Sequence, residues 1–282
     1  MTDGEKLDAG CSEDVDPVEN YYKTMADFYN RKEGSLNLID GYNCQECKNR
    51  GYTMVAEKNE FGYWQNMEYE CKCQKIRRTI RRIEKSGMKA TIKAYTIQKY
   101  QTGENWQREV KEKALRYIQE RMDNPDSDKW FYIGGETGSG KTHICTAICR
   151  ELMLRGKSVQ YMPWRDDSVT LKSMLGDMDG CQKKMQELKT IDVLYIDDLF
   201  KTGALKGEKQ KPTAADINLA FELLNYRYNN PRLVTIISSE CTLNDLLDID
   251  EAIGGRIAER SMGYAISLGY TGKKNYRKRF AG

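Results

Sequence analysis

The sequence lacks the features of membrane and secreted proteins. None of its apolar runs approaches the roughly 20 residues that a membrane-spanning helix needs, and its mean hydropathy is −0.74. Its N-terminus, MTDGEKLDAG, does not have the charged segment followed by an apolar one that marks a secretion signal. We therefore expect a cytoplasmic protein.

Histidine is almost absent, since His143 is the only one in 282 residues. Cysteine is more frequent: there are nine, an odd number, and Cys145 and Cys149 lie on an apolar helical pattern and not in loops. In a reducing compartment, clustered cysteines indicate metal ligands before disulfides. A metal centre built on such clusters would use thiolates and no histidine.

Composition divides the chain into four parts, and its length allows one good core plus a smaller module. Residues 1–19 are acidic and poor in apolar side chains, which predicts disorder. Residues 20–74 hold many tyrosines and cysteines but few long apolar runs, so they need help to fold. In residues 75–94 isoleucines alternate with basic residues, which predicts an amphipathic helical linker. Residues 95–282 form the main domain.

The main domain alternates continuous apolar strands with amphipathic helices. Strands separated by helices and without polar alternation predict an α/β fold, with a parallel sheet covered on both faces. In such folds ligands bind at the carboxyl ends of the strands. The predicted strands are residues 129–135, 158–162, 192–197, 233–238 and 263–269.

The segment GGETGSGKTH follows the first of these strands and opens a helix. Its glycines allow backbone N–H groups to surround phosphate oxygens, Lys141 would reach the β- and γ-phosphates, and Thr142 would give its hydroxyl to magnesium. The pattern predicts ATP binding. For His143, packing within the helix is the alternative to a role at the nucleotide. The predicted nucleotide-binding residues are Gly135, Glu136, Thr137, Gly138, Ser139, Gly140, Lys141, Thr142 and His143.

Acidic and hydroxyl side chains stand at the ends of two later strands. VLYIDDLF ends in Asp197, expected on the magnesium side, and Asp198, expected to polarise the attacking water; an acidic surface at a strand end is the alternative. The strand LVTIISSE ends in Ser238 and Ser239, where a hydroxyl, assigned to Ser239, would hold that water or merely cap a helix.

Two cysteine clusters occur in residues 20–74. Cys44 and Cys47 have CxxC spacing, and Cys71 and Cys73 have CxC spacing, with a strand-rich insert between them. Four thiolates predict a closed tetrahedral structural zinc, which would supply folding energy to a small segment. Reduced core cysteines or a redox pair are the alternatives.

Aromatic and basic residues near the cysteines have two interpretations. The aromatics outnumber what a small metal module easily buries, so they either form a partner-binding face or only pack the module. The basic linker either contacts nucleic acid or is solvated. The aromatics concerned are Tyr42, Tyr52, Phe61, Tyr63, Trp64 and Tyr69.

The segment GGRIAERS places Arg256 and Arg260 four residues apart, so that both guanidinium groups can reach one anion from the same helix face. On spacing alone a solvated basic face beside Glu259 is the simpler interpretation. The choice depends on the rest of the chain.

The order of phosphate loop, Asp-Asp strand, serine strand end and late arginine pair resembles AAA+ ATPases, and with the cysteine module it resembles the replicative helicase loaders of the DnaC/DnaI type. The resemblance implies five parallel strands, magnesium and ATP bound between self-associated subunits, and Arg256 and Arg260 acting on the neighbour's site, with Arg260 as the finger. It also implies that residues 20–90 bind a DnaB-family helicase through a zinc module, and that the assembly holds single-stranded DNA.

Two departures from most AAA+ proteins affect this interpretation. Asp198 stands where glutamate is usual, which suggests slow, switch-like hydrolysis, and the chain after Arg260 is too short for a C-terminal helical lid. A transposition helper ATPase of the IstB-like kind and a nucleotide-gated adaptor with little hydrolysis remain alternatives; nothing indicates the acceptor pocket of a small-molecule kinase. The basic loop 201–213 either lies near DNA or is a plain surface loop, and the basic tail 273–279 either contacts phosphate or is solvated.

Overall fold

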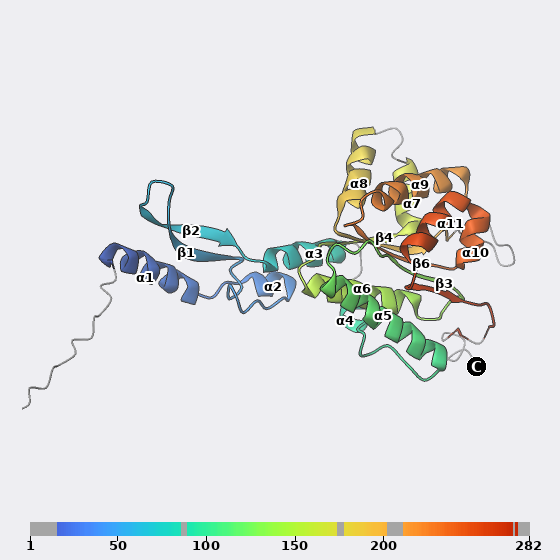
Figure 1. Cartoon of the computed structure of the whole chain (residues 1–282), viewed down its shortest axis with the longest axis horizontal. Coiled ribbons are helices and arrows are strands. Elements are labelled where there is room, and N and C mark those ends of the chain that lie inside the picture. Colours follow the sequence, from blue (N-terminus) through green and yellow to red (C-terminus); the bar gives the residue numbers. More distant parts are fainter. Residues whose placement is uncertain (1–15, 86–88, 174–177, 202–210, 273, 276–282) are drawn as a thin grey trace, which may run out of the picture. The chain divides into compact units, whose positions relative to one another are not determined.

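The computed structural model describes residues 16–85, 89–173, 178–201, 211–272 and 274–275 (Figure 1). The chain divides into two compact units, Met1–Gln74 (unit 1) and Lys75–Gly282 (unit 2). Within the described residues, no helix combines the length and the apolar character that crossing a bilayer requires.

Helix α1, Pro17–Arg31, starts inside the stretch predicted to be disordered, residues 1–19. Its start is set locally, because the carboxylate of Asp16 accepts a hydrogen bond from the backbone N–H of Val18 at 2.9 Å and proline suits the first helical position. For residues 17–19 the structure therefore corrects the predicted disorder to a capped helix. The rest of that stretch lies outside the described residues.

Unit 1 is built on a β-hairpin. Strands β1, Tyr52–Lys58, and β2, Trp64–Glu70, pair antiparallel along their whole length. Helix α1 packs on this hairpin and buries Ala26, while the short helix α2, Leu36–Asp40, precedes the first cysteines. The hairpin is the strand-rich insert expected between the two cysteine clusters.

One arginine fastens α1 to the cysteine-bearing loop. The guanidinium of Arg50 donates to the carbonyl oxygens of Tyr29 and Cys47 and to the side chain of Asn30, and it lies 4.7 Å from the centre of the Tyr29 ring. The Asn30 side chain in turn bonds both the N–H and the carbonyl of Met54 in β1. Polar bonds to the last turn of α1 thus replace much of the apolar core that so small a unit lacks.

Unit 2 contains a five-stranded parallel sheet in the order β4-β5-β6-β3-β7, which confirms the predicted α/β fold. Helix α3, Cys73–Lys85, runs across the boundary between the units, and α4, Lys89–Ala94, follows it. The sheet strands are β3 (Phe131–Gly135), β4 (Val159–Pro163), β5 (Val193–Leu199), β6 (Val234–Ser239) and β7 (Ala265–Leu268).

Helices cover both faces of this sheet. In Figure 1, α5 and α6 lie on one face and α7 to α11 on the other. After α11 the described residues contain β7 and no further helix. The helices are α5 (Asn105–Asp123), α6 (Lys141–Leu154), α7 (Trp164–Ser173), α8 (Met178–Thr190), α9 (Ala214–Tyr228), α10 (Leu243–Ile249) and α11 (Glu251–Arg260).

A buried arginine joins α8, α9 and β6. Arg227 of α9 is fully buried and donates to the carbonyl oxygens of Leu188, Lys189 and Ile191 at 3.0 Å each, and to that of Val234 at 2.6 Å. Burial lowers the pKa of its guanidinium to about 9. The arginine satisfies carbonyls that the end of α8 leaves without helical partners.

Replacing Arg227 by methionine keeps the unbranched apolar stem of the side chain but leaves these carbonyls without a donor. We expect the free energy of unfolding to fall by about 3 kcal/mol, measured by urea denaturation. Arg232→Met is the matched control, because Arg232 pairs with Asp126 at the surface and should contribute less than about 1 kcal/mol. Equal unfolding midpoints for the two variants would contradict this role of Arg227.

Candidate active site and metal centre

The phosphate loop connects β3 to α6 at the carboxyl edge of the sheet. Gly138 and Gly140 have φ angles of 76° and 84°, which side chains other than glycine rarely adopt, and α6 begins at Lys141 directly after them. These turns allow the loop to follow phosphate oxygens, and the N-terminus of α6 adds its positive dipole end. The local fold is therefore the one that the glycine spacing predicts.

Lys141 is folded back onto its own loop. Its ammonium group is buried and donates to the carbonyl oxygens of Gly135 and Glu136 at 2.9 and 2.8 Å. Burial lowers the pKa of Lys141, while the nearby carboxylates of Asp198 and Glu240 oppose this shift. Anionic phosphate oxygens are stronger partners than these carbonyls, so a bound polyphosphate can draw the ammonium toward it.

The carboxylate of Asp197 is the centre of a buried cluster of hydroxyl groups. One of its oxygens accepts from Thr142 at 3.2 Å and from Tyr195 and Ser238 at 2.5 Å each, and the other accepts from Tyr161 at 2.8 Å. Burial, reinforced by the charge of Asp197, raises the pKa values of both tyrosines, which therefore remain protonated donors.

The oxygens of Thr142 and Asp197 fit a magnesium ion. They lie 3.2 Å apart, close to the edge of about 2.9 Å between neighbouring ligands in an octahedron with Mg–O distances of about 2.05 Å. Both are hard oxygen ligands, the type that Mg²⁺ prefers. These two side chains would hold the ion beside the phosphate loop.

Asp198 lies on a strained stretch of backbone. Its φ is 55°, and the register between β5 and β6 shifts just after Ile196. Its N–H donates to Ser238 Oγ at 3.0 Å, and its carboxylate pairs with Lys201 at 2.8 Å. Local strain of this kind costs about 1–3 kcal/mol and often occurs at functional sites.

Glu240 joins the site from the end of β6, although the sequence did not suggest it. It pairs with Lys201 at 3.0 Å and bonds the side chain of Thr137 in the phosphate loop. Burial raises the pKa of Glu240, but the hydrogen bonds from Lys201 and Thr137 outweigh this and leave it below its usual value. Its position directly after the serine pair was the only signal in the sequence.

The structure separates the two serines at the end of β6. Ser238 contacts Asp197, whereas the Ser239 hydroxyl is buried, donates to the carbonyl of Leu199 at 2.7 Å and accepts from the N–H of Cys241 at 3.1 Å. Ser239 was assigned to hold the attacking water, but its hydroxyl instead joins the end of β5 to the backbone after β6. Ser238 is the serine that the fold brings to the acidic cluster.

The phosphate-loop residues 137–142 line a cavity of about 440 Å³, a volume typical of small-ligand sites, whereas Asp197, Ser238 and Ser239 lie behind its lining. His143 belongs to the lining, stacks on Tyr95 at 4.7 Å and has its Nε2 atom 2.9 Å from the carbonyl of Thr96. The lining includes Asp198, Lys201 and Glu240, but not the side chains of the predicted arginines.

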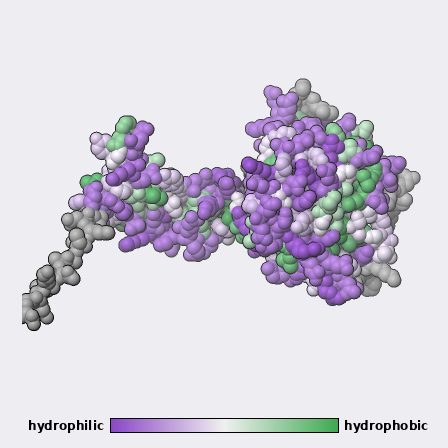
Figure 2. All heavy atoms as spheres, in the orientation of Figure 1, coloured by the Kyte–Doolittle hydropathy of each residue, from purple (hydrophilic) through white to green (hydrophobic). Residues whose placement is uncertain are grey.

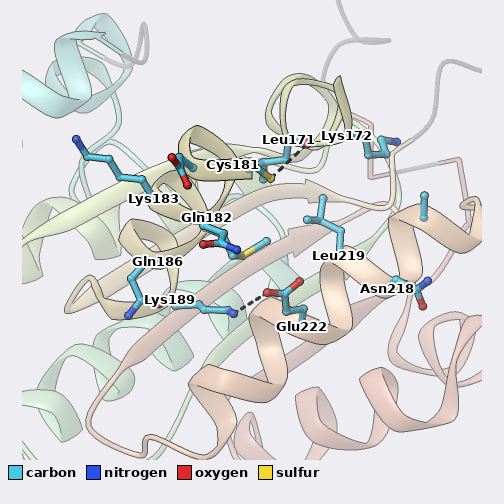
Figure 3. A pocket seen from close by; sticks show the side chains of 13 residues that line it. Leu171, Lys172, Cys181, Gln182, Lys183, Gln186, Lys189, Asn218, Leu219 and Glu222 are labelled. Atoms are coloured by element: carbon cyan, nitrogen blue, oxygen red, sulfur yellow. Dashed lines mark hydrogen bonds and ion pairs between the residues drawn. The ribbon is translucent and has the colours of Figure 1, made fainter. Parts of the chain in front are cut away.

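A larger hollow of about 930 Å³ lies between α7, α8 and α9 (Figure 3). Two of its lysines are already paired, Lys172 with Asp216 and Lys189 with Glu222, at 2.6 and 2.7 Å. None of the residues predicted for chemistry lines it. The smaller cavity is therefore the candidate active site.

Both predicted arginines are engaged with their own chain. Arg260 forms an ion pair with Asp128 and donates to the carbonyl of Tyr228, while Arg256 donates to the carbonyl of Ala252 and lies over the ring of Phe221. A role in a neighbouring subunit would require Arg260 to leave Asp128.

The four predicted cysteines come together in unit 1. Their Sγ atoms all lie within 4.8 Å of one another, with 3.8 Å between Cys44 and Cys71 and 3.5 Å between Cys47 and Cys73. Zinc with Zn–S bonds of about 2.3 Å separates its four sulfurs by about 3.8 Å, so the cluster fits a zinc ion. The hairpin brings the clusters together, because the N–H of Cys71 bonds the carbonyl of Gly51.

The surroundings of Cys47 favour a thiolate at that position, whereas burial raises the pKa of Cys71. Burial raises the pKa of Cys47, but the N–H of Gly51, which donates to its sulfur at 3.2 Å, and the neighbouring thiols outweigh this and lower it to about 7. Among the aromatics, Tyr42 packs against the cluster and Tyr52 stacks on Tyr29.

Fold and cavity together define an AAA+ protein with a phosphate-loop nucleotide site. Residues 47–277 match the family described as "IstB-like ATP binding protein", and the chain belongs to this family. The phage-like element PBSX protein XkdC of Bacillus subtilis is 31% identical over 233 residues, which make up 80% of this chain and 82% of XkdC.

A helicase loader is also among the relatives. The replicative helicase loader DnaC of Escherichia coli K12 is 30% identical over 162 residues, 56% of this chain and 64% of DnaC, so the chain matches slightly less than two thirds of that protein. Crystal structures of the DnaC helicase loader and of DnaI share the fold, with TM-scores of 0.52 and 0.50 at 19% and 23% identity; each comparison covers 64% of this chain, and 98% and 94% of the other.

Zinc coordination by four thiolates predicts that each cysteine is needed equally. Cys44→Ser and Cys71→Ser, one from each cluster, should lose zinc to the same extent in elemental analysis of the purified full-length protein, because serine is a poor zinc ligand. Cys181→Ser in α8 is the matched control and should keep its zinc. A full zinc content in either cluster variant would rule out coordination by all four cysteines.

Proposed function

We propose that the protein is a cytoplasmic ATP-dependent loader, which binds a replicative DnaB-family helicase through residues 20–90 and places it on single-stranded DNA at the start of replication. One observation carries the proposal: a phosphate-loop ATP site and a separate cysteine-cluster unit with an exposed apolar face occur in the same chain. The similarity to XkdC favours an origin in a phage or prophage.

The exposed face lies on helix α1. Val18, Tyr21, Met25 and Phe28 are 52%, 61%, 43% and 58% exposed, and their spacing of three, four and three residues forms one stripe along the helix. Such a stripe is typical of helices that pack against another helix. Phe61, Tyr63 and Tyr69 of the hairpin are exposed too, and Figure 2 shows apolar surface on this unit.

For hydrolysis, ATP supplies the γ-phosphoryl group and magnesium neutralises its charge. Lys141 binds the phosphates, Thr142 and Asp197 hold the ion, and Asp198 accepts a proton from the attacking water. One oxygen of this carboxylate is held by Lys201, which restrains the side chain of Asp198. This restraint supports slow hydrolysis, stimulated when DNA or assembly shifts Lys201.

Self-association would place α11 of one subunit near the cavity of the next. In this arrangement Arg260 exchanges Asp128 for the neighbour's γ-phosphate, and Arg256 supports it. The proposed cofactors are therefore ATP and Mg²⁺ in unit 2 and Zn²⁺ at the four cysteines of unit 1.

Two other functions are favoured by single observations. The family description supports a transposition helper ATPase, which would use the same ATP site with a transposase as partner. The ion pair of Asp198 with Lys201 supports an adaptor that binds nucleotide but hydrolyses little. Measurements of ATP hydrolysis and of partner binding distinguish the loader, the transposition helper and the adaptor.

The proposed roles predict different effects at the two ends of the site. Lys141→Ala should abolish ATP binding, whereas Asp198→Asn should bind ATP normally and lose turnover by about a hundredfold or more, because the amide cannot accept the proton. Asp126→Asn, at the surface, is the control. Equilibrium binding and phosphate release are measured with single-stranded DNA present; wild-type protein that binds ATP without turnover would support the adaptor.

The stripe on α1 predicts how the helicase is bound. Replacing both Tyr21 and Phe28 by glutamate in the full-length, zinc-loaded protein should weaken binding to a DnaB-family ring helicase by about a hundredfold, because two large apolar side chains lose their burial. Lys23→Glu places a negative charge on another exposed side of α1, two residues from Tyr21 and five from Phe28, and should bind like wild type. Absence of binding by the wild-type protein would exclude the loader.

A further inference from the structure

The residues that follow β7 return directly to the phosphate loop. Strand β7 pairs with β3 so that Leu268 lies beside Gly135, and the N–H of Glu136 donates to the carbonyl of Leu268 at 3.1 Å. We call residues 269–275 the C-terminal strap; residue 273 lies outside the described residues. The strap therefore begins next to Gly135, the first residue of the phosphate loop.

The side chain of Glu136 holds this strap. It is only 7% exposed, and one of its oxygens accepts the N–H groups of Thr271 and Gly272 at 3.0 and 3.1 Å and the Thr271 hydroxyl at 3.3 Å. The other oxygen accepts the N–H of Lys274 at 3.2 Å. Hydrogen bonds to an ionised carboxylate are about twice as strong as those between neutral groups.

Two further contacts bring the strap to either side of the candidate active site. The hydroxyl of Tyr270 donates to the carbonyl of Glu240 at 2.6 Å, at the end of β6. The amide side chain of Asn275 lies so close to Gly138 that a methyl group on this glycine would overlap it. The strap therefore contacts Glu136 and Gly138 of the phosphate loop, and it contacts Glu240 at the end of β6.

Glu136 also links the strap to the catalytic lysine. Its carbonyl accepts from Lys141 Nζ at 2.8 Å and from Ser139 Oγ at 2.7 Å, while its carboxylate holds the strap. Glu136 itself does not line the cavity. A displacement of the strap is consequently passed to the segment that positions Lys141.

We infer that Glu136 is a positioning residue: its carboxylate fastens the C-terminal strap to the outer side of the phosphate loop and so keeps the loop in its ATP-binding shape without touching ATP. The inference rests on the proposed binding of ATP at this loop. It assigns a role in ATP binding to the residues that follow β7.

A double-mutant cycle tests the inference. Full-length, zinc-loaded wild type, Glu136→Ala, Thr271→Pro and the double variant are compared for equilibrium binding of a fluorescent ATP analogue. Proline removes a donor of the strap and changes nothing in the loop, so each single variant should weaken binding by about tenfold. The double variant should bind ATP about as weakly as each single variant, because both changes break the same attachment of the strap to Glu136.

Three readouts distinguish this role from simple destabilisation. In Glu136→Ala, amide hydrogen exchange in residues 269–272 should accelerate while the urea unfolding midpoint stays near that of wild type. Glu136→Gln keeps one acceptor oxygen and should bind ATP with intermediate affinity. Glu112→Ala, which removes an exposed acid of α5, should bind like wild type.

The outcomes separate this inference from the proposed function. If the losses of ATP affinity in the two single variants multiply in the double variant, the positioning role of Glu136 is wrong. It is also wrong if Glu136→Ala binds ATP as tightly as a wild type that binds ATP. Wild-type protein that does not bind ATP would overturn the proposed function and the inference with it.

Discussion

The buried carboxylate of Asp197 is the interaction on which the architecture of unit 2 depends. A carboxylate this deep in the protein must find donors, and it finds four hydroxyl groups, from Thr142, Tyr161, Tyr195 and Ser238. These groups come from α6, β4, β5 and β6. Satisfying one charge therefore aligns three neighbouring strand ends with the start of the helix that follows the phosphate loop.

Local patterns in the sequence predicted most of this site, because their chemistry is local. The glycine spacing imposes the turns of the phosphate loop, and the continuous apolar strands require a covered parallel sheet. What the sequence did not reveal depends on strand register. Tyr161 reaches Asp197 only because β4 pairs with β5 residue for residue. The pairing of Ile196 with Ile237 carries Ser238 to Asp197, and the register shift that follows pairs Ser239 with Leu199. Helices α5, α7 and α8 were not predicted, since their sequences are more polar than those of the predicted α6 and α9.

The same distinction holds in unit 1. The cysteine spacing predicted the four-sulfur cluster, because a hairpin between two short motifs necessarily brings its ends together. The position of α1 was not predictable, since it depends on Arg50 donating to the carbonyl of Tyr29 in the last turn of the helix and on Asn30 bonding the backbone of Met54 in β1. Polar groups that act over such distances leave no periodic signal in a sequence, yet here they determine which helix face remains exposed.

The left-handed backbone at Asp198 gives a second reason for the aspartate at this position, where most AAA+ proteins have glutamate. Among residues with a side chain, aspartate and asparagine tolerate positive φ best, because their short polar groups can bond the adjacent backbone. A longer acid would reach further toward a water but would fit this turn less well. The geometry of the chain thus limits the choice of acid, and the reactivity of the site follows from a constraint on folding.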